Sequence, residues 1–261
     1  MRVLAIGDIV AEDGREFIYN NLNKIRDRFN IDFCIANGEN SANSNGITMD
    51  IANTLIDRGV DVITMGNHTF ANKDSARVLE ENPNIIRPNN FPPEIEGVGY
   101  VVKDIGIGRI AVINLIGRVN MNMADCPFHS VERALKNIDA DLIFVDMHAE
   151  ATSEKIAMAH FLDGKVTGVF GTHTHVQTAD ERVLGGGTGF ICDLGMTGVE
   201  DSVIGVRKDI IIDFYYQAGK RFRFEKAEGD VVCCGCIFDV DVSTGKTLSM
   251  ERVRLTAKDL R

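Results

Sequence analysis

The chain has 261 residues, of which 44% are hydrophobic and 25% charged, and its formal net charge is −10 at pH 7. This composition is typical of a globular protein with a large core, and the acidic charge argues against a general nucleic-acid surface or an anionic membrane partner. The sequence shows no signal-peptide pattern, no run long enough to span a bilayer and no cysteine framework for disulfides, so we expect a cytoplasmic protein.

The first part of the chain alternates short apolar strands with amphipathic helices. Strands are predicted at 2–6, 32–36, 60–65, 99–105, 109–116, 141–147 and 166–170. Helices are predicted at 14–29, 48–58, 130–138 and 152–162, the second capped by Thr48 and the last by Thr152 or Ser153. This βαβαβ pattern implies parallel strands with right-handed crossovers.

The pattern changes after Arg182, where Gly185–Gly189 reads as a turn and the helical spacing ends. Further strands are predicted at 190–193, 210–216, 221–225, 231–242 and 247–255. These strands predict a second, largely antiparallel sheet packed on the first, with helices on the outside. Since no linker or repeat interrupts the chain, we expect one domain over residues 1–261.

Polar side chains follow five of the buried strands, at the end where open α/β sheets bind their ligands. They are Asp8, Glu39, Asn40, Asn67, His68, His148, His173 and His175. Carboxylates, carboxamides and imidazoles are ligands that Mn, Fe, Co and Zn accept, and the absence of cysteine argues against a structural zinc site. Eight positions are too many for one ion, which indicates a two-metal site with a shared carboxylate.

Each of these residues also has an ordinary interpretation when taken alone. Asp8 could cap a turn, the asparagines beside glycine are common turn residues, and His148 could be a hydrogen-bonded core histidine. We expect Cys233, Cys234 and Cys236 to be core residues and assign neither His129 nor His160 to the site.

Taken in order, the motifs resemble those of the calcineurin-like metallophosphoesterases. They are Gly7-Asp8, Gly38-Glu39-Asn40, Gly66-Asn67-His68, His148 and Gly171-Thr-His-Thr-His175. The family usually has a histidine where this chain has Val10, and an aspartate where it has Glu39. Both departures, and the segment Asp193–Gly198, are similar to what the YmdB-type phosphodiesterase subfamily has at these positions. This subfamily resembles the chain over nearly its whole length.

The resemblance implies a four-layer αββα sandwich of two mixed sheets with a di-metal site. In the family arrangement, one ion is held by Asp8, Glu39, Asn40 and His175. The other is held by Glu39, Asn67, His148 and His173, so that Glu39 bridges. His68 then faces the substrate as the proton donor. The valine at position 10 removes one nitrogen ligand and leaves the metals open: iron or manganese is favoured, with zinc or cobalt as alternatives.

The resemblance implies hydrolysis of a small phosphodiester. The expected substrates are cyclic nucleotides, in particular 2′,3′-cyclic nucleotides. The expected mechanism is attack by metal-bound hydroxide with His68 as general acid. Two alternatives stay open. The same site could serve a phosphomonoesterase or 5′-nucleotidase, or the chain could be a regulatory nucleotide-binding protein with vestigial turnover. Whether the chain forms a homo-oligomer is also open.

Overall fold

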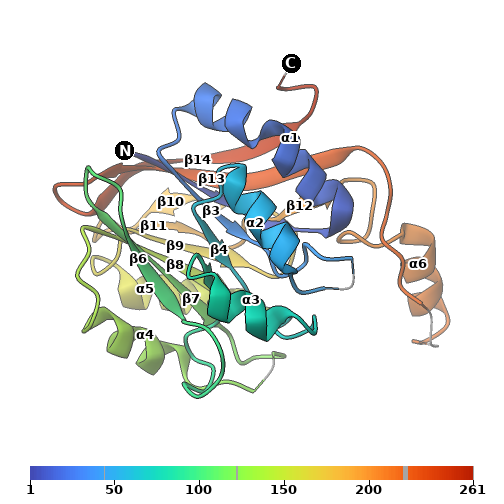
Figure 1. Cartoon of the computed structure of the whole chain (residues 1–261), viewed down its shortest axis with the longest axis horizontal. Coiled ribbons are helices and arrows are strands. Elements are labelled where there is room, and N and C mark those ends of the chain that lie inside the picture. Colours follow the sequence, from blue (N-terminus) through green and yellow to red (C-terminus); the bar gives the residue numbers. More distant parts are fainter. Residues whose placement is uncertain (44, 122, 220–222, 261) are drawn as a thin grey trace.

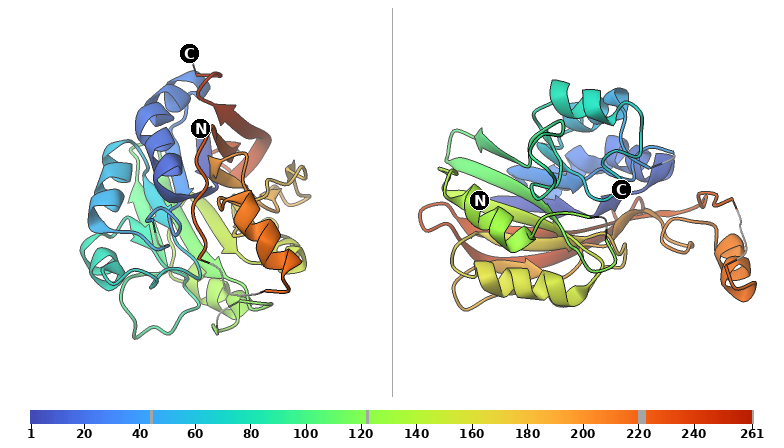
Figure 2. Two further views of the ribbon diagram at one scale, coloured as in Figure 1. Left: turned by 90° about the vertical axis from the view of Figure 1, so that its right-hand side faces the viewer. Right: turned by 90° about the horizontal axis from the view of Figure 1, so that it is seen from below.

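The computed structural model describes residues 1–43, 45–121, 123–219 and 223–260. Two mixed β-sheets pack face to face, and helices cover their outer faces (Figure 1). The view from below in Figure 2 shows the four layers edge-on. The fold is therefore the αββα sandwich that the family resemblance implied.

The first sheet has the strand order β2-β12-β13-β1-β3-β4-β5, and β14 pairs with β13. Its strands are β1 (Arg2–Ile6), β2 (Asp8–Ile9), β3 (Phe33–Asn37), β4 (Val62–Thr64), β5 (Ile85–Ile86), β12 (Met196–Val199), β13 (Val231–Asp241) and β14 (Lys246–Thr256). The parallel strands β1, β3, β4 and β5 all point the same way, so their polar carboxyl ends meet at one edge.

The second sheet has the order β10-β11-β9-β8-β7-β6. Its strands are β6 (Tyr100–Asp104), β7 (Arg109–Ile116), β8 (Leu142–His148), β9 (Gly168–Thr172), β10 (Arg182–Val183) and β11 (Gly189–Ile191). Strands β7, β8, β9 and β11 are parallel, while β6 and β10 are antiparallel edge strands.

Helices α1 (Ala11–Phe29), α2 (Met49–Asp57) and α3 (Ser75–Glu81) cover the first sheet, and α4 (Pro127–Leu135) and α5 (Thr152–Leu162) cover the second. The sixth helix, α6 (Lys208–Tyr216), projects from the body and has no buried residue (Figure 2). Among the described residues, no helix combines the length and apolarity needed to cross a membrane.

Strand alternation explains the layering, because successive side chains point to opposite faces of a sheet. In β1, Leu4 and Ile6 pack under the helices of the first layer, whereas Val3 and Ala5 pack against the second sheet. A third buried cluster lies between the second sheet and its two helices. The strands thus read as continuous apolar runs because both of their faces are covered.

The division of strands between the two sheets was predicted wrongly. Strands β8 and β9 belong to the second sheet instead of extending the first, and the C-terminal strand β13 lies in the first sheet. Strand β13 pairs antiparallel with all of β1, from Arg2 opposite Asp239 to Ile6 opposite Gly235. Local hydrophobicity does not encode such a pairing between opposite ends of the chain.

The predicted strand at 210–216 is also wrong, because this segment forms α6. The β-branched run Ile210–Ile212 favours a strand, but the segment projects from the body and is outside both sheets. Of the predicted strand 221–225, residues 221 and 222 lie outside the described residues, and 223–225 form no strand.

Two helix starts and one cap differ from the prediction. Helix α1 starts at Ala11 instead of residue 14. Helix α4 starts at Pro127 instead of residue 130, since proline suits the first turn, where no backbone donor is needed. Thr48 caps α2 by accepting from the Ile51 N–H, as predicted, but the residue before α5 is Ala151, so neither Thr152 nor Ser153 is the cap.

Candidate functional site

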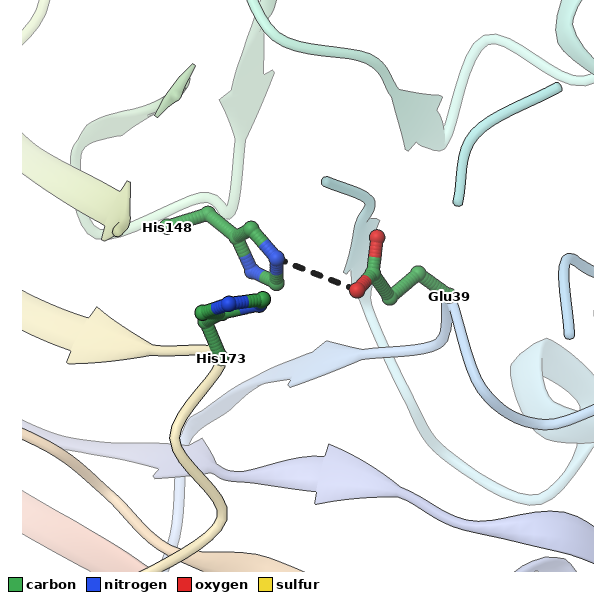
Figure 3. Close-up of side chains that lie close together, drawn as sticks. All are labelled: Glu39, His148 and His173. Carbon is green, nitrogen blue, oxygen red and sulfur yellow. Dashed lines mark ion pairs between the residues drawn. The ribbon is translucent and has the colours of Figure 1, made fainter. Parts of the chain in front are cut away.

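The carboxyl ends of strands from both sheets meet at one edge of the sandwich. Asp8 lies in β2, two residues after β1, and His148 and Thr172 end two neighbouring strands of the second sheet. The edge collects all eight side chains predicted for the site, although they come from five separate segments. Figure 3 shows how Glu39, His148 and His173 converge there.

One group, which we call the His148 cluster, consists of Glu39, Asn67, His148 and His173. The ligand atoms of Glu39, His148 and His173 all lie within 4.8 Å of one another. His148 Nε2 is 3.0 Å from Glu39 Oε1 and 2.8 Å from Asn67 Oδ1, and the side chains of His148 and Glu39 are fully buried. The rings of His148 and His173 meet edge to face with centroids 4.8 Å apart.

The orientation of His148 is set from beneath by side chains on neighbouring strands. Its Nδ1 is 2.9 Å from Thr172 Oγ1, and that hydroxyl donates to Asp146 Oδ1 at 2.7 Å. Thr64 donates to the other oxygen of the same carboxylate at 2.5 Å. When Asp146 is ionised, the Thr172 hydrogen goes to Asp146, so the hydrogen between Thr172 and His148 belongs to Nδ1 and Nε2 is left unprotonated.

The His148 cluster therefore has an excess of acceptors. The lone pair on His148 Nε2 faces the oxygens of Glu39 and Asn67, and Glu39 Oε1 receives no hydrogen bond from the described residues. Buried acceptors that face one another are unfavourable unless a donor or a cation lies between them. Imidazole nitrogen with carboxylate and carboxamide oxygen suits a transition-metal ion, so these residues fit the implied metal.

Burial determines the charge state of these groups. It raises the pKa of Glu39 and of Asp8 above the ordinary range of carboxyl groups. It also lowers the pKa of His148 to about 4, and burial together with the neighbouring His148 lowers the pKa of His173 to about 4. Both imidazoles are thus neutral at pH 7, which is the form that binds a metal.

A second group, the His175 cluster, consists of Asp8, Asn40 and His175. His175 Nε2 is 3.2 Å from Asn40 Nδ2 and 3.7 Å from Asp8 Oδ1, and that oxygen also lacks a donor among the described residues. The backbone N–H of His173 donates to Asp8 Oδ2 at 3.1 Å, which links the two clusters. The contacts here are longer than those around His148.

The turn that carries both histidines is strained and is held by a buried ion pair. His173 and His175 have φ angles of 95° and 64°, in a region that residues with a side chain rarely adopt. Thr174 between them donates to Asp193 Oδ2 through its hydroxyl at 2.7 Å and its backbone N–H at 3.2 Å. The same oxygen lies 2.6 Å from Lys155 Nζ, and both charged side chains are 1% exposed.

A cavity of about 300 Å³ opens beside the two clusters, and Glu39, Asn40, His173 and His175 line it. His68 also lines this cavity; its backbone N–H donates to Glu39 Oε2 at 2.8 Å, and its ring nitrogens are 3.3 and 3.4 Å from Asn45 Nδ2. The cavity therefore gives a ligand direct access to both clusters and to an imidazole outside them.

Sequence reasoning missed the residues that support the site. Asp146 lies in the middle of an apolar strand, and Lys155 lies on a helix, where a lysine usually faces solvent. Glu150 was also missed, although its carboxylate is 3.1 Å from His173 Nε2. An acid within a buried strand was the only available signal, because Asp146 cannot be buried without partners.

The residues left out of the site lie elsewhere. Cys233, Cys234 and Cys236 are buried in β13, and Gly185–Gly189 joins β10 to β11 as a turn. His129 and His160 lie on helices α4 and α5, and neither lines the cavity beside the clusters.

The chain matches the family model described as "YmdB-like protein" over residues 4–253. It is 40% identical over 255 residues to a Bacillus subtilis (strain 168) protein named 2′,3′-cyclic-nucleotide 2′-phosphodiesterase, covering 97% of this chain and 96% of that protein.

Two solved structures are similar over almost the whole chain. A hypothetical protein from Thermus thermophilus has a TM-score of 0.92 and 36% identity, with 98% of this chain and 99% of that chain covered. A crystal structure described as a novel phosphatase from Mycoplasma pneumoniae has a TM-score of 0.92 and 35% identity, with 98% and 93% covered. These matches confirm the resemblance inferred from the ordered motifs, and the chain belongs to the YmdB-like protein family.

Proposed function

We propose that the chain is a two-metal phosphodiesterase that hydrolyses 2′,3′-cyclic nucleotides. The observation that carries the proposal is the pair of fully buried, facing atoms His148 Nε2 and Glu39 Oε1, which a bound cation would satisfy and which lies beside a cavity. The name of the Bacillus subtilis relative supports the substrate class. When bound, two such ions would supply an activated water and would neutralise charge on the phosphoryl oxygens.

In this proposal the two clusters hold one ion each. Glu39 lies next to His148 through one oxygen and accepts the His68 N–H with the other, and in the proposal both ions would share its carboxylate. Asp8 contacts both clusters, through the His173 N–H and toward His175. The buried floor of Thr172 and Asp146 keeps His148 in the tautomer whose Nε2 can bind a metal.

His68 is the proposed general acid. It lines the cavity without belonging to either cluster, and its backbone is fixed to Glu39. Hydrolysis of a phosphodiester produces an alkoxide leaving group, and an imidazole that protonates it typically contributes about 10²–10⁴-fold to the rate. His68 therefore binds no ion but holds the proton that the departing oxygen takes.

Two assays test the proposal. The protein, loaded with Mn²⁺ or Fe²⁺, should hydrolyse adenosine 2′,3′-cyclic phosphate and bis-p-nitrophenyl phosphate faster than p-nitrophenyl phosphate, and chelation should abolish the activity. His68→Ala should lower kcat by about 10²–10⁴-fold and keep both metals, whereas His160→Ala, outside the site, should change neither. A variant at position 68 with full turnover would refute its role.

A phosphomonoesterase is the second candidate, since the Mycoplasma pneumoniae structure is described as a phosphatase. The same paired substrates decide between them, because a phosphomonoesterase prefers p-nitrophenyl phosphate. Negligible turnover of every ester with every metal would instead favour the regulatory, nucleotide-binding alternative.

A further inference from the structure

The cavity beside the metal clusters has two chemically different ends. The clusters and His68 form the polar end. Four large apolar residues also line the cavity, Val10, Ile204, Val206 and Phe224, which we call the apolar wall. Ile204 is 48% exposed and Phe224 54% exposed, and such exposure of large apolar side chains inside a cavity needs an explanation.

The apolar wall is a built structure. Two segments that flank the projecting helix α6 pair antiparallel: the Arg207 N–H donates to the Glu225 carbonyl at 3.0 Å, and the Ala227 N–H donates to the Gly205 carbonyl at 2.9 Å. Gly205 has φ +96°, and a Cβ placed there would lie 2.6 Å from Val10 Cγ1. The turn at Gly205 therefore packs directly on Val10, the residue that stands where the family usually has a histidine.

The apolar wall is also tied to the metal-binding residues. Nδ1 of His175 is 3.1 Å from the carbonyl oxygen of Ile204, to which it donates. Ile204 of the apolar wall is thus hydrogen-bonded to His175, a proposed metal ligand. A phosphate held at the polar end would leave whatever is attached to it facing Ile204 and Phe224.

The Phe224 side chain packs against a second aromatic ring. Its ring meets that of Phe214 on α6 edge to face, with centroids 5.6 Å apart. The charged residues that follow it are already paired: Glu225 with Arg207 at 2.9 Å and Lys226 with Glu12 at 3.2 Å. This side of the cavity accordingly offers a fixed aromatic surface, with its charged groups engaged elsewhere.

We propose that the apolar wall is the nucleobase subsite, where the base of a nucleoside cyclic phosphate stacks on Phe224 between Ile204 and Val206. This inference deepens the proposed function and rests on it. A cavity of about 300 Å³ is at the small end of ligand sites, so it suits one nucleotide and not a polymer. Since every base has a π-face, stacking also predicts little discrimination among the four bases.

The test compares two substrates that differ only in the base: adenosine 2′,3′-cyclic phosphate and methyl β-riboside 2′,3′-cyclic phosphate. For the metal-loaded protein we expect a higher kcat/KM on the adenosine compound. Phe224→Ala should lower the ratio of the two kcat/KM values by about 5- to 150-fold, which is the usual loss when a stacking aromatic is truncated. Phe224→Tyr should preserve the ratio.

The matched control is Tyr216→Ala, since Tyr216 is a more exposed aromatic on α6 and does not line the cavity. Its ratio should equal that of the wild type. An unchanged ratio in Phe224→Ala, or an equal fall in Tyr216→Ala, would overturn the subsite.

Failure of the proposed function gives a different result. If the wild type turns over neither compound, the phosphodiesterase proposal fails, and the subsite is then judged by calorimetric Kd values for the same two compounds. Tighter binding of the adenosine compound that is lost in Phe224→Ala would support the subsite, and equal Kd values would refute it.

Discussion

The His148 cluster and the His175 cluster lie at the same sheet edge but are built differently. In the His148 cluster, the fully buried His148 lies 3.0 Å from the fully buried Glu39 and 2.8 Å from the half-buried Asn67, and a threonine and an aspartate fix the imidazole from below. In the His175 cluster the contacts are 3.2 and 3.7 Å, the histidine opens onto the cavity, and the nearby Val10 offers no ligand. Preorganised ligands bind metals more tightly, so the two ions should differ in affinity.

The largest effect should come from Glu39, which the proposal assigns to both ions. Glu39→Gln removes the shared negative charge, so we expect loss of both ions. Activity should fall by more than about 100-fold, because losing even a residue that only hydrogen-bonds to a metal ligand costs up to about that factor. Asn40→Ala should release one ion and retain the one held by His148. Elemental analysis of the purified proteins measures both, and two ions in Glu39→Gln would contradict the shared role.

A smaller effect, on stability, is expected from the ion pair that both clusters share. Lys155→Met leaves Asp193 buried without its cation, which should lower the free energy of unfolding by about 3–5 kcal/mol. Denaturant titration measures this, and a single transition is expected if residues 1–261 form one domain. Lys24→Met, at an exposed position on α1, is the control and should have little effect. A metal loss confined to one cluster would show that the pair does not hold the whole turn.

The smallest of the three effects is a pH dependence of protein stability that arises from His148. In metal-free protein the folded state lowers the pKa of His148 from 6.5 to about 4. Between these values the unfolded chain binds a proton that the folded chain does not, so stability is lost as pH falls through this window. The wild type should lose about 3 kcal/mol between pH 7 and pH 4 relative to His148→Asn. Parallel pH curves for the two proteins in chelator would contradict this, and His160→Asn is the control.

The five strands that lead into the site could be predicted because each is a short apolar run covered on both faces. The polar residues that follow them could be collected into one set because parallel strands end at a common edge. The family resemblance then supplied the division into two ligand sets, and their roles stay predictions.

Other features depend on partners that no local pattern reveals. The pairing of β13 with β1 joins residues more than 200 positions apart, so the two sheets were divided wrongly. The segment 210–216 has the composition of a strand, yet it lies outside both sheets. Lys155 reads as a solvated helix residue, and only the tertiary structure shows that it is buried against Asp193.

The position of β13 has a consequence for synthesis. Strand β13 separates β1 from β12, and β12 in turn pairs with the two-residue strand that carries Asp8. A nascent chain that has not yet emerged beyond residue 241 cannot complete this sheet, because β1 then lacks its partner β13. Asp8 therefore gains its fixed position only after residues 231–241 have been synthesised and have paired with β1.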